Sequence, residues 1–454
     1  MAKKTGTGAA SGGRGDILTY YPYPTFRVGH REALQTLSDM WKNFDVALVI
    51  SPMGSGKTAL RRALAYWAGD AAMLVPTNAL ILQELSEFPD TNKILNRADF
   101  YKCDHCYNID LANARRRGQP VLCVPHMLVA QRLGRRTLIV DEGHKLLPVN
   151  QDLQSIHAWR RDVRYPPTTY TREQFEQYLQ LNPAVKNRDK LLAKLRTNDY
   201  MVKREMAGWR NAQLDRLRLI PLSPELHRSL SAGSERIILL SATLSDEDVY
   251  DLGVSRNKRI LKLELPSPIP AENRPLVREY VGSLSYGNLP SMAPMLARRI
   301  MDIANFHAGE KGIVHITYGL AKILRSYLPG ERFMWHTDID SKTQLAAWME
   351  TGDKILMAAG MGEGLDLKGP EFAWQIIAKI AWPSLSDVAI RKKAEGSQSW
   401  YTWQALKALL QAYGRICRGP TDIGVTYILD SSMERLTAQA RKYGLLPKYF
   451  LDVL

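Results

Sequence analysis

The sequence Val46-Ala-Leu-Val-Ile50 runs directly into Ser51-Pro-Met-Gly-Ser-Gly-Lys-Thr58, and this junction determines the fold. The apolar run predicts a buried strand. In the loop that follows, Gly54 and Gly56 allow successive backbone N–H groups to turn inward around a phosphate. The stretch therefore predicts a phosphate-binding loop between a strand and a helix.

The polar residues of this loop have separate tasks. Lys57 would reach the terminal phosphates of a nucleotide, and the hydroxyl of Thr58 would ligate Mg²⁺. Ser55, between the two glycines, is a further candidate for nucleotide binding. The strict pattern has glycine where this chain has Ser51, and another small residue still permits the turn. A chance Gly-Lys-Thr turn is the alternative, so the rest of the chain must decide.

The composition favours a soluble protein of several domains with an anionic partner. At 454 residues the chain is too long for one ordinary core, so we expect two or three domains. The net charge of +15 and the pI near 9.5 indicate nucleic acid first, with a generic basic surface as the alternative. Four cysteines do not make a disulfide framework, which favours a reducing cytoplasm. No apolar run is long enough to span a membrane, and residues 1–15 are expected to be a disordered leader.

Short apolar runs alternate with helix-like stretches along the chain. They are rich in Ile, Val and Leu without strict alternation, which suits strands covered on both faces and hence the parallel sheets of an α/β fold. The first series comprises 46–50, 72–75, 137–140 and 236–240, and the second comprises 312–316, 354–358, 374–380 and 424–429. Two series predict two sheets, in domains at 16–250 and 271–454 joined by a linker at 251–270.

Residues 150–225 interrupt this alternation, and their pattern is polar and mostly helical, with no convincing strand. Between residues 151 and 220 there are 14 Lys and Arg against 8 Asp and Glu. Aromatic residues are interleaved, and Trp159 lies beside Arg160 and Arg161. This mixture suits a groove that holds phosphates and stacks bases, although aromatics that pack a small helical core would look the same. We expect a small helical insert in the first domain.

The stretch Thr137-Leu-Ile-Val-Asp-Glu-Gly-His144 places two acids at the end of an apolar strand. Asp141 would hold Mg²⁺ through its water shell, and Glu142 would orient and deprotonate the water that attacks the γ-phosphate. Such sites form at the carboxyl ends of parallel strands. A solvated helix start is the alternative for an isolated Asp-Glu pair, but the phosphate loop upstream favours the catalytic interpretation.

Five motifs, in order, resemble those of superfamily 2 helicases. Besides the phosphate loop, they are Asp141-Glu-Gly-His144, Ser241-Ala-Thr243, residues 354–369 with their Gly-Glu-Gly-Leu-Asp, and Gln411-Ala-Tyr-Gly-Arg-Ile-Cys-Arg418. The Glu-Gly-Leu-Asp form, together with Gln-Ala-x-Gly-Arg, is most similar to the XPD/DinG branch. The match covers roughly residues 20–145 and 235–432, and five motifs in the right order make coincidence a poor explanation.

The resemblance implies two RecA-like domains with ATP bound between them. Arg415 and Arg418 would reach the γ-phosphate from the second domain when the cleft closes, and there they would stabilise transition-state charge. Gln411 would help to position the attacking water or the γ-phosphate. The alternative is that Arg415 and Arg418 form salt bridges on the surface. Their three-residue spacing on one helix face is equally compatible with that interpretation.

The resemblance implies further contacts. The residues that would relay the nucleotide state to the strand-binding face are His144, Ser241 and Thr243. Further candidates for nucleotide binding are Arg27, His30, Gly364 and Asp366. Candidates for nucleic-acid binding are Pro76, Thr77, His126, Thr317 and Gly362, with Trp159, Arg160 and Arg161 of the insert. The family usually has Gln in place of His30, and an imidazole does not make the bidentate contact of an amide with adenine.

The cysteines depart from the family pattern. The XPD/DinG branch often carries four cysteines that bind an iron–sulfur cluster between the phosphate loop and the Asp-Glu box. This chain has Cys103-Asp-His-Cys106 in that interval, whereas Cys123 lies in an apolar run and Cys417 in the arginine motif. The set does not fit a Cys₄ site. An iron–sulfur remnant and a partial zinc site are alternatives, and we favour no metal at Cys103 and Cys106.

These observations predict an ATP-dependent DNA helicase that tracks along single strands and, as the family implies, moves 5′ to 3′. The expected cofactors are ATP and Mg²⁺, and the expected partners are single-stranded and forked DNA, bound by a monomer without a membrane. RNA is the alternative substrate. Alternative functions are a translocase that does not separate strands and, from another class, an ATP-switched recruitment protein. The compact form would suit a phage-encoded enzyme in its host's cytoplasm.

Overall fold

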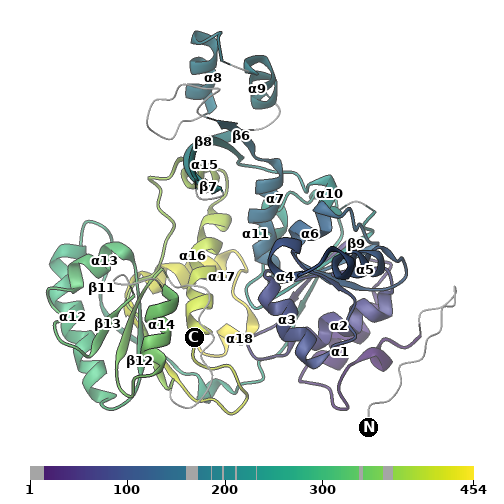
Figure 1. Cartoon of the computed structure of the whole chain (residues 1–454). Helices are drawn as coiled ribbons and strands as arrows, with labels where there is room; N and C mark the ends of the chain where they lie inside the picture. Colours follow the sequence, from purple (N-terminus) through teal and green to yellow (C-terminus); the bar gives the residue numbers. More distant parts are fainter. Residues whose placement is uncertain are drawn as a thin grey trace.

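The computed structural model describes the chain except residues 1–14, 160–171, 186, 197–198, 210–211, 232, 337–340 and 361–371. For residues 158–159, 204–209, 212–216 and 341–342 it describes the backbone without the side chains. The leader predicted at 1–15 thus lies almost entirely outside the described residues. In the described part, two α/β bodies lie side by side, and a third, smaller unit stands on the first (Figure 1).

The first sheet has seven parallel strands in the order β10-β1-β9-β5-β2-β4-β3. They are β1 (Val46–Ile50), β2 (Ala71–Leu74), β3 (Lys93–Ile94), β4 (Val121–Cys123), β5 (Thr137–Asp141), β9 (Arg236–Ser241) and β10 (Ile260–Glu264). Every residue of β1 is buried, because alternate side chains enter two different cores. Leu48 packs in one hydrophobic cluster and Val49 in the other, so helices cover both faces, as in other parallel sheets.

These helices lie before, between and after the strands in the chain. α1 (His30–Asp39) and α2 (Lys57–Ala68) cover one face, where Leu34 and Leu64 are fully buried. The remaining helices of this body are η1 (Ile17–Tyr20), α3 (Asn78–Glu87), α4 (Arg97–Phe100), α5 (Asp104–Arg115), α6 (Pro125–Ala130), η2 (Gly143–Lys145), α7 (Leu146–Gln154), α10 (Arg228–Ser231) and α11 (Asp246–Asp251). Within the described residues, no helix is both long and apolar enough to cross a membrane.

The second sheet has six parallel strands in the order β11-β16-β15-β12-β14-β13. They are β11 (Leu276–Gly282), β12 (Gly312–Ile316), β13 (Phe333–Trp335), β14 (Ile355–Ala359), β15 (Trp374–Ile377) and β16 (Val425–Asp430). The helices of this body are η3 (Ala271–Asn273), α12 (Leu289–Phe306), α13 (Tyr318–Leu324) and α14 (Ser341–Met349). Val314 and Ile313 of β12 again enter different hydrophobic clusters, so this sheet is also covered on both faces.

The last four helices join the two bodies. They are α15 (Val388–Gly396), α16 (Gln398–Tyr413), α17 (Ser432–Lys442) and α18 (Lys448–Leu451). One hydrophobic cluster contains Leu48 of the first sheet, Val249 of α11, Trp403 of α16 and Ile428 of the second sheet. The two bodies therefore share a core around α16, which lies between them in Figure 1.

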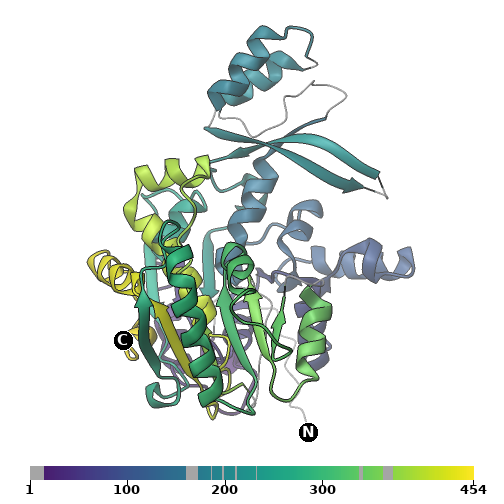
Figure 2. The same cartoon turned by 90° about the vertical axis from the view of Figure 1, so that its left-hand side faces the viewer.

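The insert between β5 and β9 contains a sheet, so the prediction of a helical insert at 150–225 is wrong in part. β6 (Ile156–Trp159), β7 (Tyr200–Trp209) and β8 (Ala212–Pro221) form an antiparallel sheet in the order β6-β8-β7. α8 (Arg172–Leu181) and α9 (Arg188–Leu195) accompany it, and Phe175 packs with Leu217 and Leu219. Figure 2 shows β7 and β8 as a long, twisted pair that projects from the first body.

The missed strands carry a signal that the helical interpretation overlooked. Leu217 and Leu219 are buried while Arg218 between them is half-buried, which is the period-two pattern of a strand with one covered face. The many charged residues of this region obscured that pattern.

The strand predictions in both α/β bodies are otherwise confirmed, because every predicted apolar run overlaps a strand, although the run 374–380 extends past β15, which ends at Ile377. The predicted linker at 251–270 is wrong in its middle, since β10 pairs with β1 at the edge of the first sheet. β10 is half-buried and carries Lys262 and Glu264, so its sequence lacks the continuous apolar run of an inner strand. The first body therefore extends to about residue 265, where the chain crosses to the second.

Two buried histidines make the fold sensitive to acid. His30 is fully buried, and burial together with the nearby Arg27 lowers its pKa to about 4. His315 on β12 is also buried. Burial lowers its pKa to about 4, although a hydrogen bond with Gln375 acts in the opposite direction. Both side chains are therefore neutral in the folded protein at neutral pH.

We predict that the free energy of unfolding falls as the pH drops from about 6.5 toward about 4. In this window the unfolded chain binds protons at both histidines while the folded chain does not, so acid favours unfolding. The loss should be of the order of 2 kcal/mol per histidine. Urea unfolding at pH 7 and pH 5 measures it. His315→Gln should remove about half of the histidine contribution. Equal pH dependence in the wild type and in His315→Gln would contradict this account.

Candidate active site

Three neighbouring strands of the first sheet end at one edge and place the predicted site residues there. β1 leads into the phosphate-binding loop, β5 ends at Asp141, and β9, between them, ends at Ser241. All three strands run parallel, so their carboxyl ends meet on the same side. The loop is tied to this edge because the backbone N–H of Ser51 donates to the carbonyl oxygen of Ser241 at 2.9 Å.

The loop requires its two glycines. Gly54 has a φ of +72° and Gly56 a φ of +87°, a region that other residues rarely adopt. A Cβ at Gly56 would also meet the side chain of Arg27 at 2.5 Å. Ser51, where the strict pattern has glycine, is fully buried and its hydroxyl lies 2.5 Å from that of Ser55. The serine therefore braces the loop from inside.

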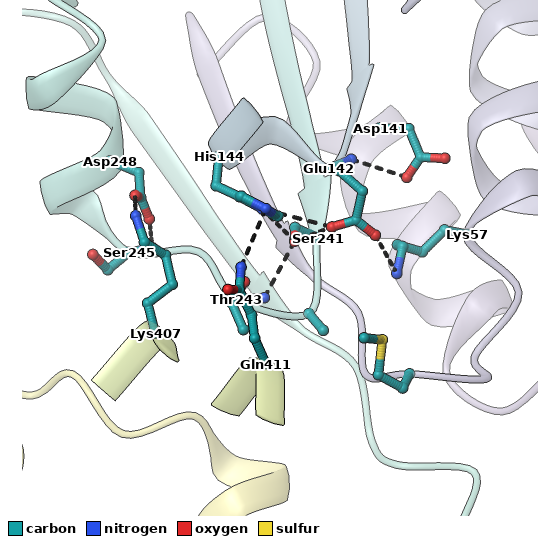
Figure 3. A network of polar contacts seen from close by, with 12 residues as sticks. Lys57, Asp141, Glu142, His144, Ser241, Thr243, Ser245, Asp248, Lys407 and Gln411 are labelled. Atoms are coloured by element: carbon teal, nitrogen blue, oxygen red, sulfur yellow. Dashed lines mark hydrogen bonds and ion pairs between the residues drawn. The ribbon is translucent and has the colours of Figure 1, made fainter. Parts of the chain in front are cut away.

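Lys57 at the start of α2 forms an ion pair with Glu142. Their Nζ and Oε1 atoms are 3.2 Å apart (Figure 3). Burial acts to lower the pKa of Lys57, but the carboxylates of Glu142 and Asp141 outweigh it and raise that pKa. Burial likewise acts to raise the pKa of Glu142, and the positive charge of Lys57 overcomes it and lowers that pKa. Both groups are charged at neutral pH, as nucleotide binding and proton acceptance require.

A directional chain of hydrogen bonds connects Glu142 with the second body. The hydroxyl of Ser241 donates to Glu142 Oε2 at 2.8 Å. Nδ1 of His144 lies 3.2 Å from that hydroxyl oxygen, and Nε2 of His144 lies 3.2 Å from Nε2 of Gln411 on α16. One tautomer satisfies the whole chain: Gln411 donates to Nε2, and the Nδ1–H of His144 donates to Ser241. Figure 3 shows this path from the carboxylate to α16.

The backbone at Glu142 is held in an uncommon conformation. Its φ of +50° and ψ of +56° lie in the left-handed region, although it is not glycine. Such strain persists where surrounding contacts overdetermine it and is frequent at functional sites. Here the contacts of Glu142 with Lys57 and Ser241 hold the carboxylate toward the loop.

Arg61 is a site residue that the sequence analysis missed. It lies on α2 one turn after Lys57, is 2% exposed, and places Nη1 2.5 Å from Asp141 Oδ2. It also pairs with Glu84 of α3, which in turn binds Arg62 at 2.9 Å. The only signal in the sequence was the pair Arg61 and Arg62 among the apolar residues of the predicted helix. The phosphate-loop pattern does not include this pair.

A cavity of about 560 Å³ lies at this edge and is lined from both bodies. The predicted residues that line it are Arg27, Gly54, Gly56, Lys57, Thr58, Asp141, Glu142, His144, Thr243, Gln411, Arg415 and Arg418. The residues that line it without having been predicted are Met53, Arg61, Leu80, Gln83, Glu84, Glu87, Lys145 and Ala242. Ser55 and Ser241 lie behind the wall, where they support the loop and Glu142.

The arginine motif of the second body touches the phosphate-binding loop. A Cβ at Gly54 would meet the carbonyl oxygen of Arg418 at 2.0 Å, and one at Gly414 would meet Met53 at 2.9 Å. Asp422 fixes the turn by accepting from the N–H of Arg418 at 2.8 Å. Arg415 and Arg418 therefore face the same cavity as Lys57.

His30 does not reach the cavity. Its ring packs against Tyr21, whose hydroxyl lies 2.8 Å from Nδ1, and the side chain is fully buried. Arg27, three residues earlier and also predicted to bind nucleotide, does line the cavity and donates to the carbonyl oxygen of Gly54 at 3.2 Å. Arg27 thus supports the loop, and the expected contact of His30 with adenine has no geometric support.

The predicted nucleic-acid contacts fall at the carboxyl ends of other strands. Pro76 and Thr77 follow β2, the exposed His126 follows β4, and Thr317 follows β12 in the second sheet. Thr77 and Thr317 cap the helices that begin there, since each hydroxyl accepts from a backbone N–H of its helix. Pro76, Thr77 and His126 therefore lie at the same edge of the first sheet as the nucleotide cavity, but outside it. In the second sheet Thr317 lies at the carboxyl end of β12, whereas Arg415 and Arg418 precede the amino end of β16. Gly362, Gly364, Asp366, Arg160 and Arg161 lie outside the described residues, as does the side chain of Trp159.

Two residue sets bear on metal binding. Thr58 and Asp141 line the cavity together, and a hydroxyl and a carboxylate are suitable oxygen ligands for Mg²⁺. These two oxygen donors therefore fit Mg²⁺, although Arg61 already contacts Asp141.

Cys103 and Cys106 are exposed, with their sulfurs 2.9 Å apart at the start of α5. In the described ranges there is no group of three or more side chains suited to hold a metal.

Gly54→Ala should lower the rate of nucleotide hydrolysis by at least about tenfold, because its Cβ would push the Arg418 turn away from the loop. Gly118→Ala is the matched control, since Gly118 has a φ of +78° but no atom within 4 Å of the position that a Cβ would take. Both variants should lose about 1 kcal/mol of stability from the backbone conformation. Equal hydrolysis rates in the two variants would contradict the role of this contact.

Arg61→Met should lower the free energy of unfolding by about 3 kcal/mol, because it removes a cation from between two buried or half-buried carboxylates. Chemical unfolding followed by tryptophan fluorescence measures this loss. Arg97→Met removes an exposed ion pair with Asp104 and should leave stability unchanged. A stability of Arg61→Met equal to that of Arg97→Met would show that the buried network is not needed.

Comparisons with known proteins agree with this architecture. Residues 316–448 match the helicase C-terminal domain family. A solved structure of an XPD helicase has a TM-score of 0.64 at 15% identity and covers 93% of this chain and 98% of that chain. Xpd4 of S. tokodaii has a TM-score of 0.60 at 13% identity, with 92% and 98% covered. An apo XPD structure gives 0.61 at 16% identity, with 91% and 98% covered. No curated protein matches the sequence.

These likenesses confirm the predicted fold of two RecA-like, parallel-sheet bodies. At such identities the solved structures establish the fold alone, and the family match concerns the second half of the chain. The chain thus has an XPD-like helicase fold, and its residues 316–448 match the helicase C-terminal domain family.

Proposed function

We propose that this protein is an ATP-driven motor that moves along single-stranded DNA and separates duplex strands. The observation that carries the proposal is the composition of the cavity: Lys57 and Glu142 enter it from the first body, and Arg418 enters it from the second. A site assembled from two bodies can couple a bound triphosphate to their relative movement.

The residues of the first body would bind the nucleotide and activate water. Backbone N–H groups of the loop and Lys57 would hold the phosphates, and a triphosphate would compete with Glu142 for Lys57. Once released from that ion pair, the ionised Glu142 would accept the proton of the attacking water. Mg²⁺, held by Thr58 and Asp141, would neutralise charge on the phosphate oxygens.

The residues of the second body would make hydrolysis depend on closure. Arg415 and Arg418 line the cavity and would stabilise the charge that develops on the γ-phosphate. Gln411 would respond to movement of the Glu142 carboxylate, because His144 and Ser241 connect the two residues by hydrogen bonds. Opening of the cleft after hydrolysis would break this chain.

DNA is the proposed substrate, and direction and strand separation rest only on the sequence resemblance to the XPD/DinG branch. The basic charge of +15 and the strand ends at Thr77, His126 and Thr317 support contact with a phosphate backbone. Backbone contacts would make binding weaken steeply as salt rises. Movement from 5′ to 3′, the Gly362 contact and the contacts of Trp159, Arg160 and Arg161 belong to this proposal, as do the nucleotide contacts of Gly364 and Asp366.

We predict that single-stranded DNA raises the rate of ATP hydrolysis by at least about tenfold, and that Lys57→Ala and Glu142→Gln abolish this hydrolysis. Steady-state phosphate release without polymer, with single-stranded DNA and with single-stranded RNA measures it. Stimulation by RNA alone would move the proposal to an RNA motor. Hydrolysis that neither polymer affects would overturn it and favour an ATP-switched recruitment protein.

Tailed duplexes separate the helicase from its nearest rival. A helicase releases the short strand in an ATP-dependent reaction that Lys57→Ala lacks. A translocase would hydrolyse ATP on the same DNA without releasing that strand. Duplexes with a 5′ or a 3′ tail then report the direction of movement.

A further inference from the structure

The acidic helix α11 is held by α15 and α16 from the C-terminal half. The indole N–H of Trp403 donates to Asp248 Oδ2 at 2.8 Å, and Lys407 Nζ lies 3.0 Å from Asp248 Oδ1. The indole N–H of Trp400 donates to Asp251 Oδ2 at 3.1 Å, and Lys393 pairs with the same carboxylate. We call this group of side chains the α11 clasp: Asp248, Asp251, Lys393, Trp400, Trp403 and Lys407.

Asp248 is the centre of the α11 clasp. It is 9% exposed, Trp403 is fully buried, and the Lys407 side chain is 16% exposed. A third contact of Asp248, accepted from the backbone N–H of Ser245 at 3.1 Å, closes a capping box at the start of α11. A buried carboxylate of this kind is tolerated only while its partners remain in place. Asp248 thus fixes α16 to the first turn of α11.

The α11 clasp and the catalytic network share one face of α16. Residues 400, 403, 407 and 411 are spaced by three or four positions, so they lie on the same side of the helix. One turn separates Lys407, which binds Asp248, from Gln411, which contacts His144. Figure 3 shows the two contacts next to each other on α16. The helix then ends at Tyr413, and Arg415 and Arg418 follow.

The segment that precedes α11 also contacts the nucleotide site. Ser245 comes two residues after Thr243, which lines the cavity, and Ser241 binds Glu142. Asp248 therefore lies between two segments that both contact the nucleotide site, the end of β9 and α16. A shift of α16 along or around its axis would move Gln411 and the two arginines together.

We propose that Asp248 is a positioning residue for ATP hydrolysis, which it serves by holding Lys407 and Trp403 so that α16 presents Gln411, Arg415 and Arg418 to the cavity. This inference rests on the proposed function. The phosphate-binding loop, Lys57 and Thr58 belong to the first body, so the α11 clasp acts on the hydrolytic step and leaves nucleotide binding unchanged.

The test is steady-state ATP hydrolysis with saturating single-stranded DNA, together with equilibrium binding of a fluorescent ADP. Lys407→Met should lower kcat by about tenfold with a KM for ATP within about twofold. Lys407→Arg should restore most of kcat, because it keeps the positive charge beside Asp248. Asp248→Asn keeps an acceptor for Trp403 and removes the charge, so it should lower kcat in the same way.

Lys392→Met is the matched control. Lys392 is on α15 and pairs with Asp199 of the insert at 3.0 Å, outside the α11 clasp, so this variant should retain the wild-type kcat. Urea unfolding of each variant shows that it is folded.

Wild-type kcat in both Lys407→Met and Asp248→Asn would overturn the inference alone, as would a fall in kcat with Lys407→Arg as large as with Lys407→Met. Absence of ATP hydrolysis by the wild type would overturn the proposed function and the inference with it.

Discussion

The nucleotide site depends on the packing of α16 against the first body. This helix lies between β15 and β16 of the second sheet in the chain, yet Trp403 is buried in a cluster that also contains Leu48 and Val249 of the first body. Because the apolar contact fixes α16, Gln411 on the same face of the helix meets His144, and the arginine turn reaches Gly54. Hydrophobic burial supplies the attraction between the bodies, and the polar contacts select their register.

The charges of the site are arranged around this contact. Lys57 and Glu142 neutralise each other across the loop, and Arg61 pairs with both Asp141 and Glu84. Each pair is positioned where a triphosphate and its cation would bind, so in the proposed mechanism an incoming nucleotide would exchange existing partners for new ones. This exchange would release Glu142 from Lys57 and leave it to act as the proposed base. The left-handed backbone of Glu142 is held in place by the surrounding contacts.

Much of this arrangement could be predicted from the sequence, for definite physical reasons. Strands such as Val46–Ile50 are buried on both faces, so their composition alone identifies them. Glycines with a positive φ, such as Gly54, and acids at strand ends, such as Asp141, are required by chemistry that leaves little choice. The strands of the insert were missed because β7 and β8 face solvent on one side. β10 was missed because it is an edge strand. Arg61 and Asp248 escaped notice because their roles come from partners distant in sequence, Asp141 and Lys407. His30 shows the reverse case, since a position that resembles a ligand is buried against Tyr21.

The central claim is that both bodies complete one catalytic site, and Arg418 tests it most directly. Binding of a fluorescent ATP analogue and single-turnover ATP hydrolysis should be measured for wild type, Arg418→Ala and Lys57→Ala. The account predicts that Arg418→Ala binds nucleotide as the wild type does but hydrolyses it at least about 100-fold more slowly, whereas Lys57→Ala loses both. Hydrolysis by Arg418→Ala at the wild-type rate would contradict a site shared between the two bodies.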